Sequence, residues 1–204
     1  MTTILLATTN PGKIREFNRI LESLPGGIRA AAPDAAMPEV EESGATFEAN
    51  ARIKAEALSS VQQGWVVADD SGLVVDALGG EPGIRSARYG EPEVKGLDDA
   101  GRVRLLLDRM RDVPDAERTA RFVCLLAVAR EGRVEATFEG TCEGGVAHEP
   151  AGTGGFGYDP VFRFPAADRT FGELLPEDKD RFSHRAQALW RLAAWFSEYH
   201  ATAR

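Results

Sequence analysis

Two adjacent carboxylates, Asp69 and Asp70, are the residues of this sequence best suited to chemistry. They stand between the apolar runs Val66–Ala68 and Leu73–Val75, so the pattern predicts two buried strands joined by a sharp Asp-Asp-Ser-Gly turn. Gly72 would allow the tight turn. Neighbouring carboxylates repel each other and are costly to bury, and Mg²⁺ would compensate both. From these residues alone, a solvated turn without metal is the alternative.

A second candidate site lies near the N-terminus. Thr3–Thr8 predicts a short buried strand, and Asn10 is a suitable cap for the helix expected after it. A helix N-terminus beside Lys13 favours an anion such as phosphate. The segment is not a P-loop, because Ala7 and Ile14 occupy the positions that require Gly and Ser or Thr. A capped helix with a surface lysine is the alternative.

An acidic run, Glu39–Glu42, precedes a helix that we predict over Thr46–Gln63. Helix-dipole physics explains acidic residues at this place without any further function. Asn50 and Lys54 are four residues apart and therefore share one helix face. Lys54 becomes chemically relevant only if that face borders Asp70.

The segment Gly152–Pro160 places four glycines around Phe156 and Tyr158. Such a segment is typical of backbone that approaches a flat ligand, on which Phe156 could stack. A hairpin loop with a core aromatic residue is the alternative. Lys179 and the pair His184–Arg185 follow, and a solvated polar pair is the usual interpretation of the latter.

The remaining pattern predicts an α/β chain. We expect helices over 11–24, 97–110 and 188–196, strands over 119–129 and 133–141, and an irregular segment over 143–152 that contains a surface residue, His148.

Bulk properties limit the function classes. The 204 residues carry a net charge of −8, which argues against nucleic-acid or anionic-membrane surfaces. No apolar run reaches transmembrane length, and no linker requires a domain boundary, so we expect one domain over 1–204. Cys124 and Cys142 are too few and too distant for a zinc or redox motif, which favours a reducing, cytoplasmic setting.

Together, these segments resemble the inosine/xanthosine triphosphate pyrophosphatase family over nearly the whole chain. One departure is Thr9, where close relatives often carry Gly or Ser. The motifs that carry the resemblance are Thr8–Lys13 with Glu16, Thr46–Ala51 with Lys54–Ala55, Ala68–Leu73, Pro82–Tyr89, Gly154–Pro160 and Ser183–Arg185.

The resemblance implies an elongated mixed β-sheet flanked by helices, in two lobes with a central nucleotide-binding cleft, and a homodimer. It implies hydrolysis of ITP, dITP or XTP to the nucleoside monophosphate and pyrophosphate, with Mg²⁺. An orthophosphate-releasing phosphatase and a non-catalytic nucleotide-binding regulator are the alternatives.

The resemblance also assigns roles. Asp70 would be the catalytic carboxylate and a metal ligand, with Glu42 as the second ligand and Glu41 as its alternative. The residues that would bind the substrate are Thr8, Thr9, Asn10, Pro11, Gly12, Lys13, Lys54, Ser71, Phe156, Gly157, Tyr158, Asp159, Lys179, His184 and Arg185.

Overall fold

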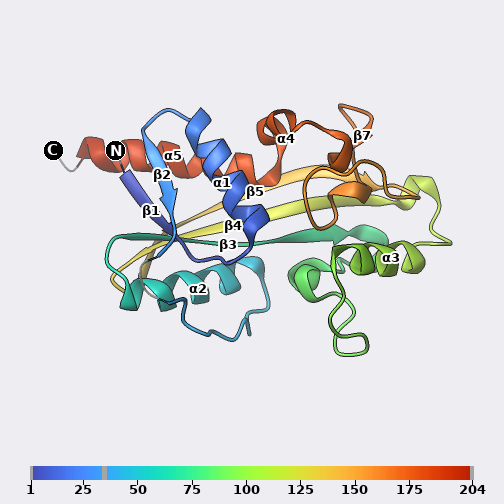
Figure 1. Cartoon of the computed structure of the whole chain (residues 1–204), viewed down its shortest axis with the longest axis horizontal. Helices are drawn as coiled ribbons and strands as arrows, with labels where there is room; N and C mark the ends of the chain where they lie inside the picture. Colours follow the sequence, from blue (N-terminus) through green and yellow to red (C-terminus); the bar gives the residue numbers. More distant parts are fainter. Residues whose placement is uncertain (1, 34–35, 203–204) are drawn as a thin grey trace. The chain divides into compact units, whose positions relative to one another are not determined.

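The computed structural model describes residues 2–33 and 36–202, which form a mixed β-sheet flanked by helices (Figure 1). The helices and strands in this part of the chain are β1 (Thr2–Leu6), α1 (Pro11–Ser23), β2 (Ile28–Ala31), α2 (Phe47–Val61), β3 (Trp65–Val75), α3 (Asp99–Arg109), β4 (Thr119–Arg130), β5 (Arg133–Val146), β6 (Phe162–Phe164), β7 (Arg169–Thr170), α4 (Pro176–Phe182) and α5 (His184–Thr202).

Within the described residues, seven strands form one sheet in the order β2-β1-β3-β4-β5-β6-β7. Strand β1 runs parallel to β2 and β3, whereas β6 runs antiparallel to β5 and β7. The prediction of a mixed α/β sheet is therefore confirmed.

The chain divides into two compact units. Unit 1 comprises the described residues up to Asp70, Cys124–Gly140, and the described residues from His184 onward; unit 2 comprises Ser71–Val123 and Thr141–Ser183. Strands β3, β4 and β5 contribute residues to both units. The single domain over 1–204, the elongated shape and the central cleft stay predictions.

Unit 1 has one apolar core on each face of its sheet. Because side chains alternate along a strand, Val67 packs with α1 and α5, whereas Val66 and Ala68 pack with α2. Figure 1 shows α1 and α5 on one side of the strands and α2 on the other. By the same alternation, Asp69 shares the face of Val67, and Asp70 shares the face of Ala68.

The predicted turn at Asp69–Gly72 is wrong, because β3 is continuous through it. Gly72 serves close packing: a Cβ there would collide with the Ser86 hydroxyl and the Gly83 carbonyl. The same Ser86 hydroxyl accepts a hydrogen bond from the Leu73 N–H at 2.9 Å. Contacts that are distant in sequence therefore override a composition typical of turns.

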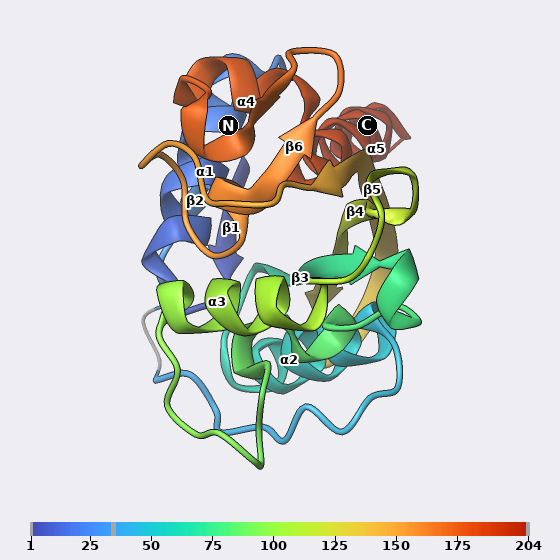
Figure 2. The same ribbon diagram turned by 90° about the vertical axis from the view of Figure 1, so that its right-hand side faces the viewer.

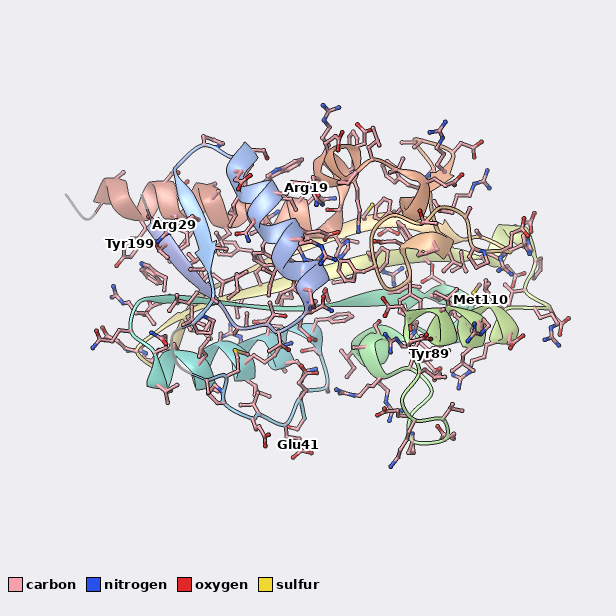
Figure 3. The ribbon with its side chains drawn as sticks, in the orientation of Figure 1. Arg19, Arg29, Glu41, Tyr89, Met110 and Tyr199 are labelled. Carbon is pink, nitrogen blue, oxygen red and sulfur yellow. The ribbon has the colours of Figure 1, made fainter. Side chains whose placement is uncertain are left out.

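Unit 2 packs around a separate apolar core that includes Leu73, Leu106 and Phe162. Figure 2 shows α3 and α4 on opposite sides of its strands, and Figure 3 shows Tyr89 and Met110 beside α3. Strand β5 continues to Val146, so the irregular segment predicted from residue 143 begins later than expected.

The predicted caps of α1 and α2 are confirmed, whereas α5 begins at His184, four residues before the expected start at residue 188. The Asn10 side chain accepts a hydrogen bond from the Lys13 N–H, and the Thr46 side chain accepts one from the Ala49 N–H. Asp98 caps α3 in the same way. Within the described residues, no helix combines the length and the apolar character needed to span a membrane.

Candidate active site

The start of helix α1 brings the predicted triphosphate-binding residues, Thr8–Lys13, together in unit 1. Asn10 Oδ1 accepts from the Lys13 N–H at 3.1 Å, and the Asn10 N–H donates to Thr8 Oγ1 at 3.2 Å. Pro11 occupies the first helical position, where no N–H is required. The remaining N–H groups of this turn and the helix dipole favour a negative ligand.

Asp69 is enclosed by cations. Its side chain is 1% exposed, with Lys13 Nζ 2.5 Å from Oδ1 and Arg185 Nε 2.8 Å from Oδ2. Arg185 pairs in addition with Glu16. Burial alone would raise the pKa of Asp69, but Arg185 and Lys13 hold that pKa well below its usual range. These contacts therefore favour the ionised form of Asp69, which neutralises the partly buried Lys13 and the buried Arg185.

Asp70 points to the opposite face of the sheet and has different contacts from Asp69. Lys54 Nζ lies 2.7 Å from Oδ1, whereas Oδ2 is buried and has no hydrogen-bond partner in the part of the chain that the structure describes. Burial raises the pKa of Asp70, and the nearby Lys54 and Lys13 only partly oppose this. An uncompensated buried oxygen of this kind can bind a cation or accept a proton.

Lys54 joins Asp70 to the acidic run. Its Nζ also lies 3.1 Å from Glu42 Oε1. Burial would lower the pKa of Lys54, but Asp70, Glu42 and Asp69 outweigh it and raise the pKa overall. Glu41 is exposed and points away from the ribbon in Figure 3. Of the two alternatives, Glu42 is the one beside the same ammonium as Asp70, and its role as a ligand stays a prediction.

The loop that carries Glu42 is fixed by a side chain of helix α2. Asn50 is fully buried, and its Oδ1 accepts a hydrogen bond from the Gly44 N–H at 2.8 Å. A Cβ at Gly44 would lie 2.6 Å from Asn50 Oδ1 and 2.7 Å from Ala49 Cβ. The absence of a side chain at Gly44 therefore lets this loop lie against α2.

The donor set suits Mg²⁺. No group of three His, Cys, Asp or Glu residues that could hold a metal occurs among the described residues. Asp70 and Glu42 nevertheless both contact the Lys54 ammonium, so the two carboxylates lie beside a common positive charge. Mg²⁺ typically uses one or two protein carboxylates and keeps several waters, so two ligands are sufficient.

Unit 2 holds a second group of predicted site residues. Lys179 Nζ lies 2.6 Å from Asp159 Oδ2, and both side chains are at most 4% exposed. The same oxygen accepts from the Phe156 N–H at 2.9 Å. Lys179 Nζ also lies 5.2 Å from the centre of the Phe156 ring. The buried ion pair therefore sets the orientation of the Phe156 loop.

Other predicted residues of unit 2 have structural contacts. Tyr158 is 4% exposed, and its hydroxyl donates to the Ser86 carbonyl at 3.0 Å. The Gly157 N–H donates to Asp99 Oδ2 at 2.7 Å. Ser71 is half-buried and is the first residue of unit 2, directly after Asp70. Substrate contact by these residues stays a prediction.

His184 and Arg185 begin helix α5 in unit 1 and are buried, so the predicted solvated pair is wrong. Their position depends on Gly140, where a Cβ would collide with the His184 carbonyl and the Ala188 N–H. Strand β5 therefore approaches the first turn of α5 without a side chain between them.

Sequence reasoning missed the pairing of Glu16 with Arg185. A signal was present, because Glu16 lies between buried positions of the apolar helix face and three residues after Lys13. The partner 169 residues away carries no local signal.

A hollow of about 680 Å³ in unit 2 is lined by none of the predicted site residues. Several of its charged groups contact each other or the backbone: His148 pairs with Asp115, Arg163 pairs with Asp168, and Arg118 donates to four backbone carbonyls. The hollow carries no functional assignment. His148 is a surface residue, as predicted.

Similarity to known proteins extends over nearly the whole chain. A sequence model of the Ham1 family matches residues 4–195. A dITP/XTP pyrophosphatase from Geobacillus kaustophilus (strain HTA426) is 49% identical over 201 residues, covering 97% of this chain and 96% of the relative.

Two solved structures are similar as well. A HAM1 protein from Coxiella burnetii superposes with a TM-score of 0.84 at 37% identity, over 97% of this chain and 100% of that one. A nucleoside-triphosphatase / dITP/XTP pyrophosphatase from Mycobacterium abscessus gives a TM-score of 0.72 at 43% identity, over 94% and 98% of the two chains.

Proposed function

This chain belongs to the Ham1 family, and on that basis we propose that it hydrolyses non-standard purine nucleoside triphosphates to the monophosphate and pyrophosphate. The observation that carries the proposal is Asp70, whose buried Oδ2 has no hydrogen-bond partner among the described residues. Similarity to dITP/XTP pyrophosphatases supports the choice of ITP, dITP and XTP as substrates.

Asp70 and Glu42 would hold Mg²⁺, since both contact the Lys54 ammonium. When bound, Mg²⁺ supplies positive charge to the phosphates and lowers the pKa of water. Asp70 orients the attacking water and accepts its proton. The water oxygen bonds to the α-phosphorus as the bond from this phosphorus to the bridging oxygen breaks, and pyrophosphate leaves.

The triphosphate brings about four negative charges to an acidic protein, so local cations are required. Lys13 and the N-terminus of α1 would bind it, with Lys54 assisting. Their support in the structure is the geometry of unit 1, where Lys13 is held beside the turn that Asn10 caps.

The base would stack on Phe156, whose loop is fixed by Asp159 and Lys179. Hypoxanthine and xanthine present a 6-oxo acceptor where adenine presents an amino donor. A buried donor from His184 or Arg185 would pair with the first and be left unpaired by the second. Such a mismatch can discriminate by up to about 10⁴-fold.

We also propose a cytoplasmic homodimer. The two cysteines, Cys124 and Cys142, are both free, which fits a reducing compartment. Light scattering coupled to size-exclusion chromatography measures the mass in solution. A mass near the 22.1 kDa of one chain would contradict the dimer.

The decisive experiment is a panel of nucleoside triphosphates with Mg²⁺, in which pyrophosphate and orthophosphate are measured separately. We expect pyrophosphate from ITP, dITP and XTP. Orthophosphate alone would favour a terminal phosphatase, and binding without turnover would favour a regulator.

A matched pair of variants tests the role of Asp70. We expect Asp70→Asn to bind nucleotide but to lose about 10²–10⁴ in rate. Asp76→Asn, the same change at an exposed carboxylate just after the end of β3, should retain activity. Equal rates in the two variants would exclude Asp70 as the base.

A further inference from the structure

Every oxygen of Asp69 is already occupied. Lys13 Nζ contacts Oδ1 at 2.5 Å, and Arg185 Nε contacts Oδ2 at 2.8 Å. Cys124 Sγ lies 3.5 Å from the same Oδ2 and can donate its S–H. The backbone carbonyl of Asp69 accepts from Lys54 Nζ at 3.0 Å and from Lys13 Nζ at 3.3 Å. Each carboxylate oxygen therefore already contacts a cation, and the side chain is almost completely buried, which disfavours the approach of a metal ion.

The charges of unit 1 fall into two groups. The inner cluster contains two carboxylates and two cations, so it is electrically balanced without any ligand. The outer cluster contains two carboxylates that contact one ammonium, and Oδ2 of Asp70 in this cluster accepts no hydrogen bond from the described residues. The inner cluster is Lys13, Glu16, Asp69 and Arg185, and the outer cluster is Glu42, Lys54 and Asp70.

The inner cluster joins elements that are far apart in the sequence. Lys13 belongs to α1, Asp69 to β3 and Arg185 to α5, and α1 and α5 lie on the same face of the sheet (Figure 1). Both cations are long, flexible side chains, and fixing such a chain in one rotamer costs conformational entropy. A buried carboxylate between them fixes both at once.

We propose that Asp69 is a positioning residue: its carboxylate fixes the Lys13 ammonium and the Arg185 guanidinium for substrate binding, and it touches neither the metal nor the substrate. This inference rests on the proposed function for the roles of Lys13 and Arg185. The two neighbouring aspartates then have different roles, because the side chain of Asp70 belongs to the outer cluster and that of Asp69 belongs to the inner one.

Kinetics of the same Asp→Asn change at a buried and at an exposed position test the inference. We expect Asp69→Asn to raise the KM for dITP by about tenfold or more, while the exposed control Asp76→Asn stays within about twofold of wild type. A wild-type KM in Asp69→Asn would overturn the positioning role.

Asp69→Asn leaves the partly buried Lys13 and the buried Arg185 with one fewer counter-charge and can fail to fold, so a double variant keeps the inference testable. Lys13→Met/Asp69→Asn removes one charge of each sign and keeps the inner cluster balanced. If Asp69 acts through the cations, kcat/KM of this double variant stays within about tenfold of Lys13→Met alone. A larger additional loss would mean that Asp69 itself contacts the substrate or the metal.

Two measurements need no turnover and therefore judge the inference even if the proposed activity fails. Mn²⁺ titration without nucleotide should give Asp69→Asn an affinity within about threefold of wild type, whereas Asp70→Asn loses at least about tenfold. Equal losses would make Asp69 a metal ligand. Acetylation of Lys13, followed by mass spectrometry, should accelerate in Asp69→Asn relative to the exposed Lys95. An unchanged ratio would show that Asp69 does not hold Lys13.

Discussion

Replacing Lys179 by methionine tests the energetics of unit 2. The Lys179–Asp159 pair is buried on both sides, at 4% and 2% exposure. Removing one partner of such a pair typically costs about 3–5 kcal/mol, because the remaining charge stays buried. For chains of this length, 1 kcal/mol lowers Tm by about 2–4 °C, so Lys179→Met should lower it by about 6–20 °C. Asp159 Oδ2 would keep the hydrogen bond from the Phe156 N–H but would lose its cation.

Thermal unfolding without nucleotide, followed by circular dichroism, measures the effect. The matched control is Arg52→Met, which breaks an exposed pair with Glu48 and should lower Tm by no more than about 2 °C. The double variant Lys179→Met/Asp159→Asn removes both charges and keeps an acceptor for the Phe156 N–H. It should recover at least half of the loss. A Tm within 2 °C of wild type for Lys179→Met, or no recovery in the double variant, would show that an unpaired charge on Asp159 does not destabilise the protein.

Four further predictions concern thiols, packing and metal binding. Burial raises the pKa of Cys142 to about 12 and also raises the pKa of Cys124. At pH 8 only about 10⁻⁴ of Cys142 is therefore thiolate, the form that reacts. Ellman's reagent should detect no rapidly reacting thiol until the protein unfolds. Because the unfolded chain releases these protons first, the free energy of unfolding should fall as pH rises from about 8.5 to 12. Gly72→Ala should destabilise by about 1–3 kcal/mol through collision with Ser86, measured by urea unfolding; an unchanged midpoint would contradict the close packing. Gly44→Ala should weaken Mn²⁺ binding by displacing the acidic loop, and unaltered affinity in a titration would exclude that coupling.

Local signals in the sequence were sufficient for much of the fold. Asn10 and Thr46 cap the helices that their residue types predict, because a capping bond is made within three residues. The error at Asp69–Gly72 has the opposite cause. Asp, Ser and Gly favour turns locally, yet here they continue a strand because their partners come from distant segments such as Ser86.

In the candidate site, too, local patterns could not indicate partners that are distant in the sequence. Residue types and spacing indicated Asp70, Lys54 and Lys13, and the structure brings these three together in unit 1. They could not indicate that Asp69 pairs with Arg185, 116 positions away. The sequence therefore suggested one metal compensating both aspartates, whereas each has its own cation.

The alternation of β3 has a consequence for insertions and deletions. A one-residue deletion just before Asp69 would exchange the faces of the two acids. Asp69 would then point toward α2, and Asp70 would point toward Lys13 and Arg185. An insertion or deletion of two residues would keep each acid on its own face and would only shift both acids along the strand. The site therefore depends on the register of β3 as much as on the presence of the two aspartates.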